Sequence, residues 1–216
     1  MDIATRDATE ADAEFVAWVQ LAAARSHVEI GFWDLVFNDK PDDAEILRNM
    51  VGVVAARARS FSHWSGFRIA EVDGVPAAGL SGYEPAKVTD EVMGEALLEA
   101  ATTLNWAPEV LGNFGERAAP FLECIEPAPA DHWVVEWVAT KAEFRGKGLV
   151  KRLLHEMLER GRERGFRHAQ ISVLLGNTPA ERAYEGIGFR TFDDKTSPAF
   201  EAAMGAAGLR RMRMDL

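Results

Sequence analysis

The spacing of apolar and polar positions predicts strands and helices that alternate along the 216-residue chain. In some stretches apolar side chains recur every three or four residues, which is the period of an amphipathic helix. In shorter stretches they alternate or run without interruption, which is typical of strands. The predicted helices cover residues 9–25, 41–59, 89–106, 149–160 and 178–184, with a further short one around 117–124. The predicted strands cover residues 2–6, 67–72, 75–81, 133–139, 168–175, 189–192 and 209–215.

The residues that connect these elements predict how three of the connections are built. Asp73-Gly74 separates two strands and supplies the positive φ angles of a tight turn, so a β-hairpin is predicted there. Pro41 stands where the second helix would begin. Residues 28–37 are aromatic and have no regular period, which predicts a loop that packs over a pocket. The order of elements favours one mixed sheet flanked by helices, an α/β (α+β) fold.

Composition indicates a folded protein that needs no disulfides. Hydrophobic residues make up 48% of the chain and charged residues 27%, which excludes a disordered chain. Cys124 is the single cysteine, so no intrachain disulfide can form. The first residues carry no apolar leader, and no apolar run approaches the roughly 18 to 20 residues that span a bilayer. We therefore expect a cytoplasmic protein.

Charge is distributed unevenly along the chain. With 24 basic and 34 acidic side chains the net charge is −10, which argues against nucleic acid or an anionic membrane as a partner. Residues 141–170 nevertheless hold 9 basic and 4 acidic side chains. This basic segment predicts a local anion site, such as one for a phosphorylated cofactor. A solvated helix face with surplus arginine is the alternative.

A pair of glycines lies where the strand of residues 133–139 passes into the helix of residues 149–160. Gly146 and Gly148 would let the backbone approach a ligand closely, and the first amides of the helix lack internal partners. The basic side chains around them are Arg145, Lys147, Lys151 and Arg152. Together these features could cradle a pyrophosphate, and a plain strand-to-helix turn is the alternative. The common nucleotide-loop signatures are absent.

A second motif covers residues 177–189. Thr178 is a candidate N-cap, Pro179 suits the first helical position and Glu181 completes a capping box. Helix initiation does not account for Asn177 and Tyr184. By themselves these two residues are explained by a turn and by a half-buried packing site.

The two motifs together resemble the GNAT superfamily of N-acetyltransferases, whose members transfer an acyl group from acyl-coenzyme A to a primary amine. Residues 142–148 match the family's pyrophosphate motif, with Glu143 in place of glutamine or arginine and Ala142 in place of proline. The downstream motif is met by Asn177, Ala180, Tyr184, Glu185, Gly188 and Phe189. The resemblance is specific over residues 132–192.

This resemblance implies a single domain over residues 1–216, with a mostly antiparallel sheet and splayed central parallel strands. Residues 132–192 would form the cofactor-binding core, and residues 86–131 would be a helical insert. Acetyl-coenzyme A would be the co-substrate, and no metal is expected. The cofactor-binding residues that it implies are Val138, Thr140, Arg145, Gly146, Lys147, Gly148, Leu149, Val150, Asn177 and Tyr184. Tyr184 would also be the general acid that protonates the departing thiolate.

The general base is the less defined of the two catalytic roles. Glu136 lies on the same strand as Val138 and Thr140, and simple alternation places the three side chains on one face of the sheet. A structural ion pair is the alternative for this carboxylate. His132 and Glu123 are weaker candidates. Ser172 stands where some relatives carry a base, and it cannot serve alone.

The resemblance also implies where the acceptor would bind, namely residues 27–40 and 195–208. In the first of these segments aromatic side chains could line an apolar pocket and acidic ones could attract a cation. These residues are Phe32, Trp33 and Phe37, and Glu29, Asp34 and Asp39. Aromatic packing in the core is the alternative. The expected partner is a small-molecule or peptide amine, and the sequence leaves a homodimer open.

Three functions are therefore compared. The first is an acetyl-coenzyme A dependent N-acetyltransferase, which the presence of Tyr184 favours. The second is a non-catalytic acyl-coenzyme A binding module with a regulatory role, which the undefined base leaves open. The third, an unrelated binder of nucleotide phosphates, is disfavoured because the loop signatures are missing.

Overall fold

The computed structural model describes residues 1–37 and 42–216. The strands are β1 Ile3–Asp7, β2 Phe67–Val72, β3 Val75–Tyr83, β4 His132–Thr140, β5 His168–Leu174, β6 Arg190–Thr196 and β7 Gly208–Asp215. The α-helices are α1 Ala13–Arg25, α2 Phe32–Phe37, α3 Asp43–Val54, α4 Asp90–Leu104, α5 Pro108–Gly112, α6 Phe114–Leu122, α7 Leu149–Glu163, α8 Thr178–Glu185 and α9 Pro198–Met204. Short 3-10 turns are η1 Glu10–Asp12, η2 Trp64–Gly66, η3 Pro85–Lys87 and η4 Ala142–Phe144.

The described strands form one seven-stranded sheet in the order β1-β2-β3-β4-β5-β7-β6. The two central strands, β4 and β5, are parallel, and the other neighbouring pairs are antiparallel. This confirms the mixed, mostly antiparallel sheet expected from the sequence. Parallel neighbours need a long crossover, and α7 is the helix that supplies it.

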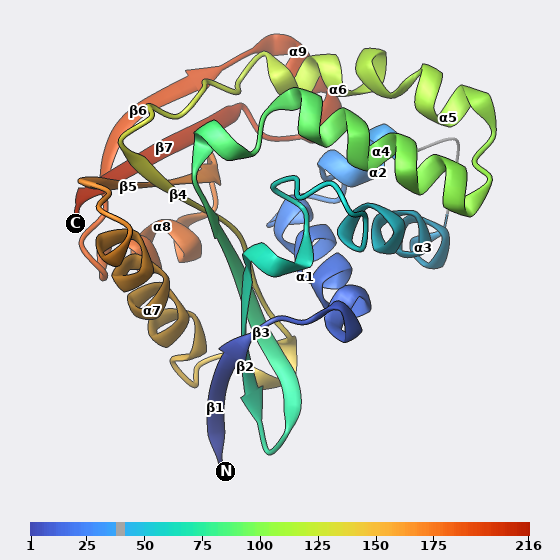
Figure 1. Cartoon of the computed structure of the whole chain (residues 1–216). Helices are drawn as coiled ribbons and strands as arrows, with labels where there is room; N and C mark the ends of the chain where they lie inside the picture. The colour runs from blue at the N-terminus through green and yellow to red at the C-terminus, as the bar shows by residue number, and fades with distance from the viewer. Residues whose placement is uncertain (38–41) are drawn as a thin grey trace.

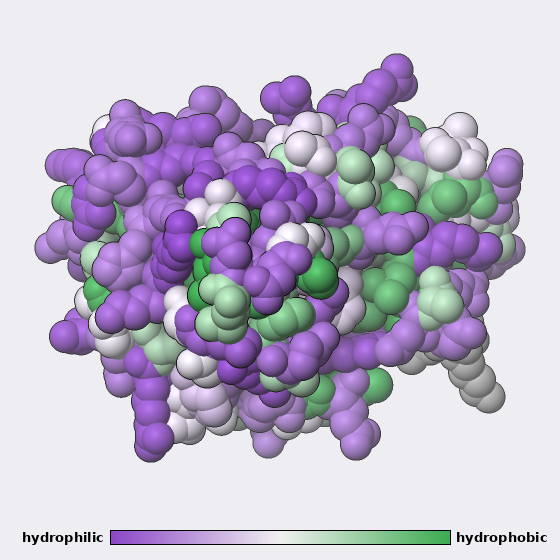
Figure 2. Space-filling view, turned by 90° about the horizontal axis from the view of Figure 1, so that it is seen from below, coloured by the Kyte–Doolittle hydropathy of each residue, from purple (hydrophilic) through white to green (hydrophobic). Residues whose placement is uncertain are grey.

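Helices cover both faces of the sheet (Figure 1). On one face α7 buries Leu153, Leu154 and Met157 in a core that also holds Tyr184 of α8. On the other face α1 and its neighbours build a second core around Val16. Polar side chains predominate on the surface seen in Figure 2, and apolar ones gather in smaller patches between them. Among the described residues no helix is both long and apolar enough to cross a membrane.

The pairing between the two central strands, β4 and β5, ends half-way along β4. Pairing between β4 and β5 runs from His132 with His168 to Val135 with Ile171 and stops there. Beyond that point β4 continues to pair with β3 on its other side. The parallel strands therefore splay, as expected, and leave one edge of β4 open.

A β-bulge occurs in β4 where the splay begins. Glu136 lies opposite Ser81, whereas Ala139 lies opposite Gly79, so β4 contains one residue more than β3 between these pairs. Trp137 has a positive φ of 54°, which marks the bulged position. The bulge interrupts the alternation of side chains, and this determines which face each of the following residues occupies.

Four local predictions differ from the structure. Residues 32–37 form helix α2 rather than a loop, because the Asp34 carboxylate accepts a hydrogen bond from the Gly31 amide at 2.8 Å and caps its start. The predicted helix 41–59 is shorter, and Asp42 caps it by accepting from the Glu45 amide at 2.8 Å. Pro41 lies outside the described residues. Helix α9, begun by Ser197 and Pro198, was not predicted, and β6 extends to Thr196.

The predicted helical insert is ordered and helical, with α4, α5 and α6 in sequence. Helix α4 packs along α3, and α6 packs between α2 and α9. Its two ends leave the sheet together, because Tyr83 at the end of β3 pairs with Val134 at the start of β4. The insert therefore leaves the sheet at the end where β4 and β5 are still paired, before the point where the two strands splay.

Candidate active site

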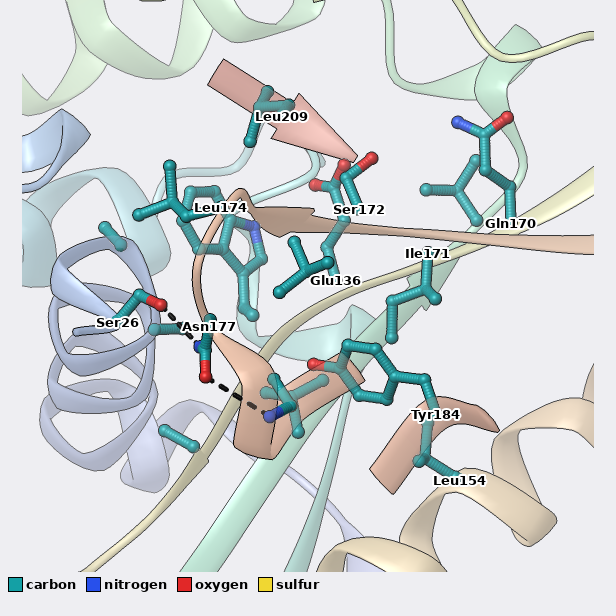
Figure 3. A pocket seen from close by; sticks show the side chains of 18 of the residues that line it. Ser26, Glu136, Leu154, Gln170, Ile171, Ser172, Leu174, Asn177, Tyr184 and Leu209 are labelled. Atoms are coloured by element: carbon teal, nitrogen blue, oxygen red, sulfur yellow. Dashed lines mark hydrogen bonds between the residues drawn. The ribbon is translucent and has the colours of Figure 1, made fainter. Parts of the chain in front are cut away.

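A cavity of about 1700 Å³ opens where β4 and β5 diverge. Its walls come from β4, β5, the start of α7, α8, the end of α1 and both ends of the insert. Figure 3 shows Tyr184, Glu136, Ser172 and Asn177 around it. Both tyrosines of the chain, Tyr83 and Tyr184, line this cavity.

The glycine loop forms one end of the cavity. Gly146 and Gly148 have φ angles of 76° and 74°, in the left-handed region that other residues rarely adopt. The Arg152 amide makes the first backbone bond of α7, to the Gly148 carbonyl at 3.1 Å. Within the described chain no acceptor is found for the amides of residues 146–151. These amides and the positive end of the helix dipole suit an anion.

The basic segment divides into paired and unpaired side chains. Most of its arginines are in ion pairs with nearby carboxylates: Arg152 with Glu156, Arg160 with Asp7, Arg162 with Glu159, Arg164 with Glu84 and Arg167 with Asp131. By contrast, Arg145, Lys147 and Lys151 have no ion-pair partner in residues 1–37 or 42–216, and all three line the cavity. The anion-site interpretation therefore applies to the loop, and the helix-face interpretation applies to most of the remaining segment.

We expect a Gly146→Ala/Gly148→Ala variant to bind acetyl-coenzyme A at least about tenfold more weakly, because positive φ disfavours side chains and the amides would turn away from a phosphate. No atom lies within 4 Å of a Cβ built at either site, so overpacking does not contribute. Calorimetric titration measures the affinity. The matched control is Gly74→Ala/Gly165→Ala, which has the same positive φ and the same open space away from the cavity. Equal affinities for the two folded variants would contradict the expectation.

The open edge of β4 forms the middle of the cavity. The Lys141 amide donates to the Ala77 carbonyl of β3 at 2.9 Å, which fixes which backbone groups face β3. Because alternate residues of a strand direct their amides to opposite edges, Val138 and Thr140 direct theirs toward the open side. An extended ligand could hydrogen-bond to β4 there, as the sequence predicts for these two residues.

Tyr184 is buried on α8, and its hydroxyl points into the cavity (Figure 3). Burial raises the pKa of this phenol above its usual value, so it holds its proton at neutral pH. Within the described residues no group hydrogen-bonds to the hydroxyl. A buried phenol without a partner is suited to donate a proton to a ligand in the cavity.

Glu136 lies on the opposite wall, on β4. Burial in the cavity raises the pKa of its carboxyl group to about 7, and a hydrogen bond from Tyr83 opposes part of that rise. Within the described chain Glu136 has no ion-pair partner, so the structural ion pair considered above is not supported. A carboxylate that titrates near neutrality can accept a proton at physiological pH.

Glu136 does not share a face of the sheet with Val138 and Thr140, contrary to the prediction from alternation. Val138 packs in the core under α7, whereas Trp137 and Ala139 pack on the α1 side. Tyr83, which contacts Glu136, is close to Phe61 on that same α1 side. Because of the bulge at Trp137, Glu136 lies on the face opposite to Val138 and Thr140. Glu136 and Tyr184 therefore reach the cavity from opposite faces of the sheet.

Tyr83 is a site residue that the sequence did not reveal, because its neighbour Glu136 is far away in the chain. We expect Tyr83→Phe to raise the pH midpoint of turnover by about one unit, since burial would then raise the pKa of Glu136 without opposition. A pH–rate profile tests this. In a Glu136→Gln background the same substitution should leave the profile unchanged. An unshifted midpoint in the single variant would show that Tyr83 does not tune Glu136.

Asn177, rather than the predicted Thr178, caps α8. Its side-chain oxygen accepts from the Ala180 amide at 3.2 Å, and its amide nitrogen donates to Ser26 at 2.6 Å (Figure 3). This ties the start of α8 to the end of α1 beside the cavity. Glu181 pairs with Arg210 at 3.1 Å instead of closing a capping box. The turn interpretation of Asn177 thus accounts for its protein contacts, and it also lines the cavity.

The weaker base candidates are placed differently from Glu136. His132 is buried, contacts Asp131 at 2.9 Å and does not line the cavity. Glu123 accepts a hydrogen bond from Ser197 and is also outside the lining. Ser172 lines the cavity from β5 (Figure 3).

The expected acceptor segments contribute little to the cavity. Trp33 and Phe37 are buried in the core, which agrees with the alternative of aromatic packing. Of the three aromatic residues, Phe32 alone lines the cavity. Asp34 pairs with Arg25 at 2.7 Å, and Glu29 is exposed away from the lining. Asp39 and Lys40 lie outside the described residues. No residue of the segment 195–208 belongs to the lining.

The sequence profile of the Acetyltransferase (GNAT) family matches residues 33–189. The chain belongs to this family. Among solved structures, one described as an acetyltransferase has a TM-score of 0.70 at 18% identity and covers 98% of both chains. An N-acetyltransferase from Staphylococcus aureus Mu50 has a TM-score of 0.66 at 17% identity, covering 98% of this chain and 100% of its own.

A putative acetyltransferase from Salmonella typhimurium, solved with acetyl-coenzyme A, has a TM-score of 0.54 at 16% identity and covers 99% and 94% of the two chains. These likenesses support the GNAT fold. A search of curated proteins gives no match. No cluster of three or more His, Cys, Asp or Glu side chains in the described parts of this GNAT chain could hold a metal ion.

The cavity fits the coenzyme that GNAT proteins use. At the start of α7, amides and three cations without partners among the described residues suit a pyrophosphate, and the open edge of β4 suits an amide-bearing arm. Each feature is a property of this chain's own backbone and side chains. The residues present therefore fit coenzyme A.

Proposed function

We propose that the protein is an acetyl-coenzyme A dependent N-acetyltransferase that acetylates a primary amine of a small molecule or peptide by direct attack. The observation that carries the proposal is the placement of Glu136 and Tyr184 on opposite walls of one cavity, with protonation states suited to a base and an acid. Membership of the GNAT family supports the transfer of an acetyl group.

Acetyl-coenzyme A supplies the acetyl group as a thioester, whose C–S bond breaks as the amine nitrogen forms the new C–N bond. The proposed roles of the chain concern protons and orientation. The Glu136 carboxylate takes the proton that the amine must lose, directly or through water, and its pKa near 7 makes it available at neutral pH. The Tyr184 hydroxyl donates its proton to the departing sulfur.

The amides of residues 146–150 and the cations Arg145, Lys147 and Lys151 would hold the pyrophosphate. The Arg145 amide, predicted with them, donates instead to the Ala142 carbonyl at 3.3 Å. The backbone of Val138 and Thr140 would orient the pantetheine arm. Asn177 would support this arm from the start of α8. Positioning of this kind replaces a bimolecular encounter and lowers the entropic part of the barrier.

A panel of primary amines with acetyl-coenzyme A tests the proposal, with release of free thiol as the measurement. We expect release that depends on the amine, and acetyl-coenzyme A should bind in calorimetry where ATP does not. Binding without release for every amine would favour the non-catalytic regulatory module. Failure to bind acetyl-coenzyme A would overturn both functions.

A further inference from the structure

The cavity extends beyond Glu136 to a wall that the two ends of the insert build. One end is the segment 85–91 and the other is the segment 121–130, and we call them together the insert wall. It is lined by Pro85, Ala86, Val88, Thr89, Asp90, Glu91, Phe121, Leu122, Cys124, Ile125, Glu126, Pro127, Ala128 and Ala130. The pairing of Tyr83 with Val134 brings these distant segments together at the start of β4, where β4 is still paired with β5.

Two large apolar side chains on the insert wall are exposed. Leu122 is 53% exposed and Ile125 is 42% exposed, although the neighbouring Phe121 is anchored by stacking on Phe200. The Ile125 amide donates to the Leu122 carbonyl at 3.1 Å, so the two follow one turn. Adjacent exposed apolar side chains inside a cavity indicate a surface that an apolar ligand covers.

The charged side chains of the insert wall that line the cavity are all acidic, namely Asp90, Glu91 and Glu126, and Glu126 is paired with Lys195 at 2.6 Å. Lys87 belongs to the same segments but lies outside the lining and pairs with Glu84 at 2.8 Å. Asp90 and Glu91, in the first turn of α4, stand at the exposed edge. The wall would attract a cation and repel a carboxylate. Three cationic side chains of the lining, Arg145, Lys147 and Lys151, lie at the glycine loop instead. Arg182 lines the cavity from α8, and Arg211 lines it from β7, where it pairs with Asp193.

We propose that the insert wall binds the acceptor, and that the acceptor is a primary amine on an uncharged, aromatic or branched aliphatic body with no carboxylate beside the amine. This inference rests on the proposed acetyltransferase function and adds the class of substrate. The apolar body lies against Leu122 and Ile125, and the ammonium group enters past Asp90 and Glu91 toward Glu136. Burial of one such body should improve kcat/KM by about tenfold to a hundredfold.

The experiment compares four amines: 2-phenylethylamine, isopentylamine, ethanolamine and phenylalanine. We expect kcat/KM for the first two to exceed that for ethanolamine, which lacks the apolar body, and for phenylalanine, which adds a carboxylate, by at least about tenfold. Equal values for all four would overturn the inference while leaving the acetyltransferase function intact.

Variants then locate the preference. Leu122→Ser and Ile125→Ser should raise KM for 2-phenylethylamine by about tenfold and leave ethanolamine unaffected. The matched control is Leu98→Ser, because Leu98 is 59% exposed on α4 and does not line the cavity. Equal effects of Leu98→Ser and Leu122→Ser would overturn the assignment. An unchanged KM for Leu122→Ser and Ile125→Ser, together with loss of a dimer in solution, would also overturn the assignment. That result would place these side chains in a self-association surface.

Calorimetry with 2-phenylethylamine in the presence of coenzyme A separates the two proposals, because it needs no turnover. One possible result is that 2-phenylethylamine binds, that Leu122→Ser weakens this binding, and that none of the amines leads to thiol release. This result would support the insert wall as an amine site and overturn the proposed enzyme. Amine-dependent thiol release without such a binding preference would support the proposed enzyme and overturn the insert wall as the amine site.

Discussion

Tyr184→Phe should lower kcat by about 10²- to 10⁴-fold and change the affinity for acetyl-coenzyme A by no more than about threefold. The substitution removes only the hydroxyl that points into the cavity and keeps the ring that packs beside Phe189. Stability should change little, since in the described residues the hydroxyl makes no hydrogen bond that would be lost.

Steady-state kinetics and calorimetry measure the two quantities for Tyr184→Phe. Tyr83→Phe is the matched control, because it removes the other phenol of the cavity. In the control the pH profile should move while the maximal rate is largely kept. If Tyr184→Phe retained the wild-type kcat, the proton would reach the sulfur from solvent or from another group.

Glu136→Gln should lower the rate at neutral pH by about tenfold or more and partly recover at high pH, where the amine loses its proton without help. In the wild type the rate should rise through a midpoint near pH 7, where Glu136 becomes ionised. The Glu136→Gln variant should lack this rise in rate around pH 7. Glu91→Gln, an exposed acid of the same cavity, is the control and should keep it. A profile identical to that of the wild type would remove Glu136 from the mechanism.

The same substitution should also change the pH dependence of stability. The pKa of Glu136 is about 7 in the folded protein and near 4.5 in the unfolded chain, so the folded state binds this proton more tightly. The resulting stabilisation is complete below about pH 4.5 and is lost as the pH rises through 7. Glutamine does not ionise, so the variant should melt higher than the wild type at pH 8 and similarly at pH 4. A structural ion-pair partner would show the opposite trend.

Local signals in the sequence predicted the structural elements around the glycine loop and Tyr184. The glycine pair, the amphipathic stripe of α7 and the residues around Tyr184 lie within one short region, and their arrangement depends mainly on neighbours in the chain. The cap of α8 differs from the prediction: Asn177 and Thr178 are both good caps, and Asn177 makes the capping bond as well as the contact with Ser26.

The end of the cavity near Glu136 and the insert depends on contacts that single-sequence patterns do not encode. Alternation along β4 cannot reveal the extra residue at Trp137, so the predicted face of Glu136 was wrong. The contact between Tyr83 and Glu136 follows from the register of β3 with β4 across the whole insert. For the same reason the apolar wall at Leu122 could not be assigned to the cavity from its place in the chain.

Because the insert joins the sheet away from the glycine loop, the residues of the insert could change without changes in the loop. The two ends of the insert meet at the Tyr83–Val134 pair, on the far side of Glu136 from the glycine loop. Under the two proposals above, amine selectivity and coenzyme binding would belong to separate parts of the chain. Exchanging residues 86–131 for a different helical segment could retune the choice of amine while the coenzyme cradle stays as it is. The exchange would need to preserve the packing of α4 on α3 and of α6 on α2 and α9, because those contacts hold the segment against the domain.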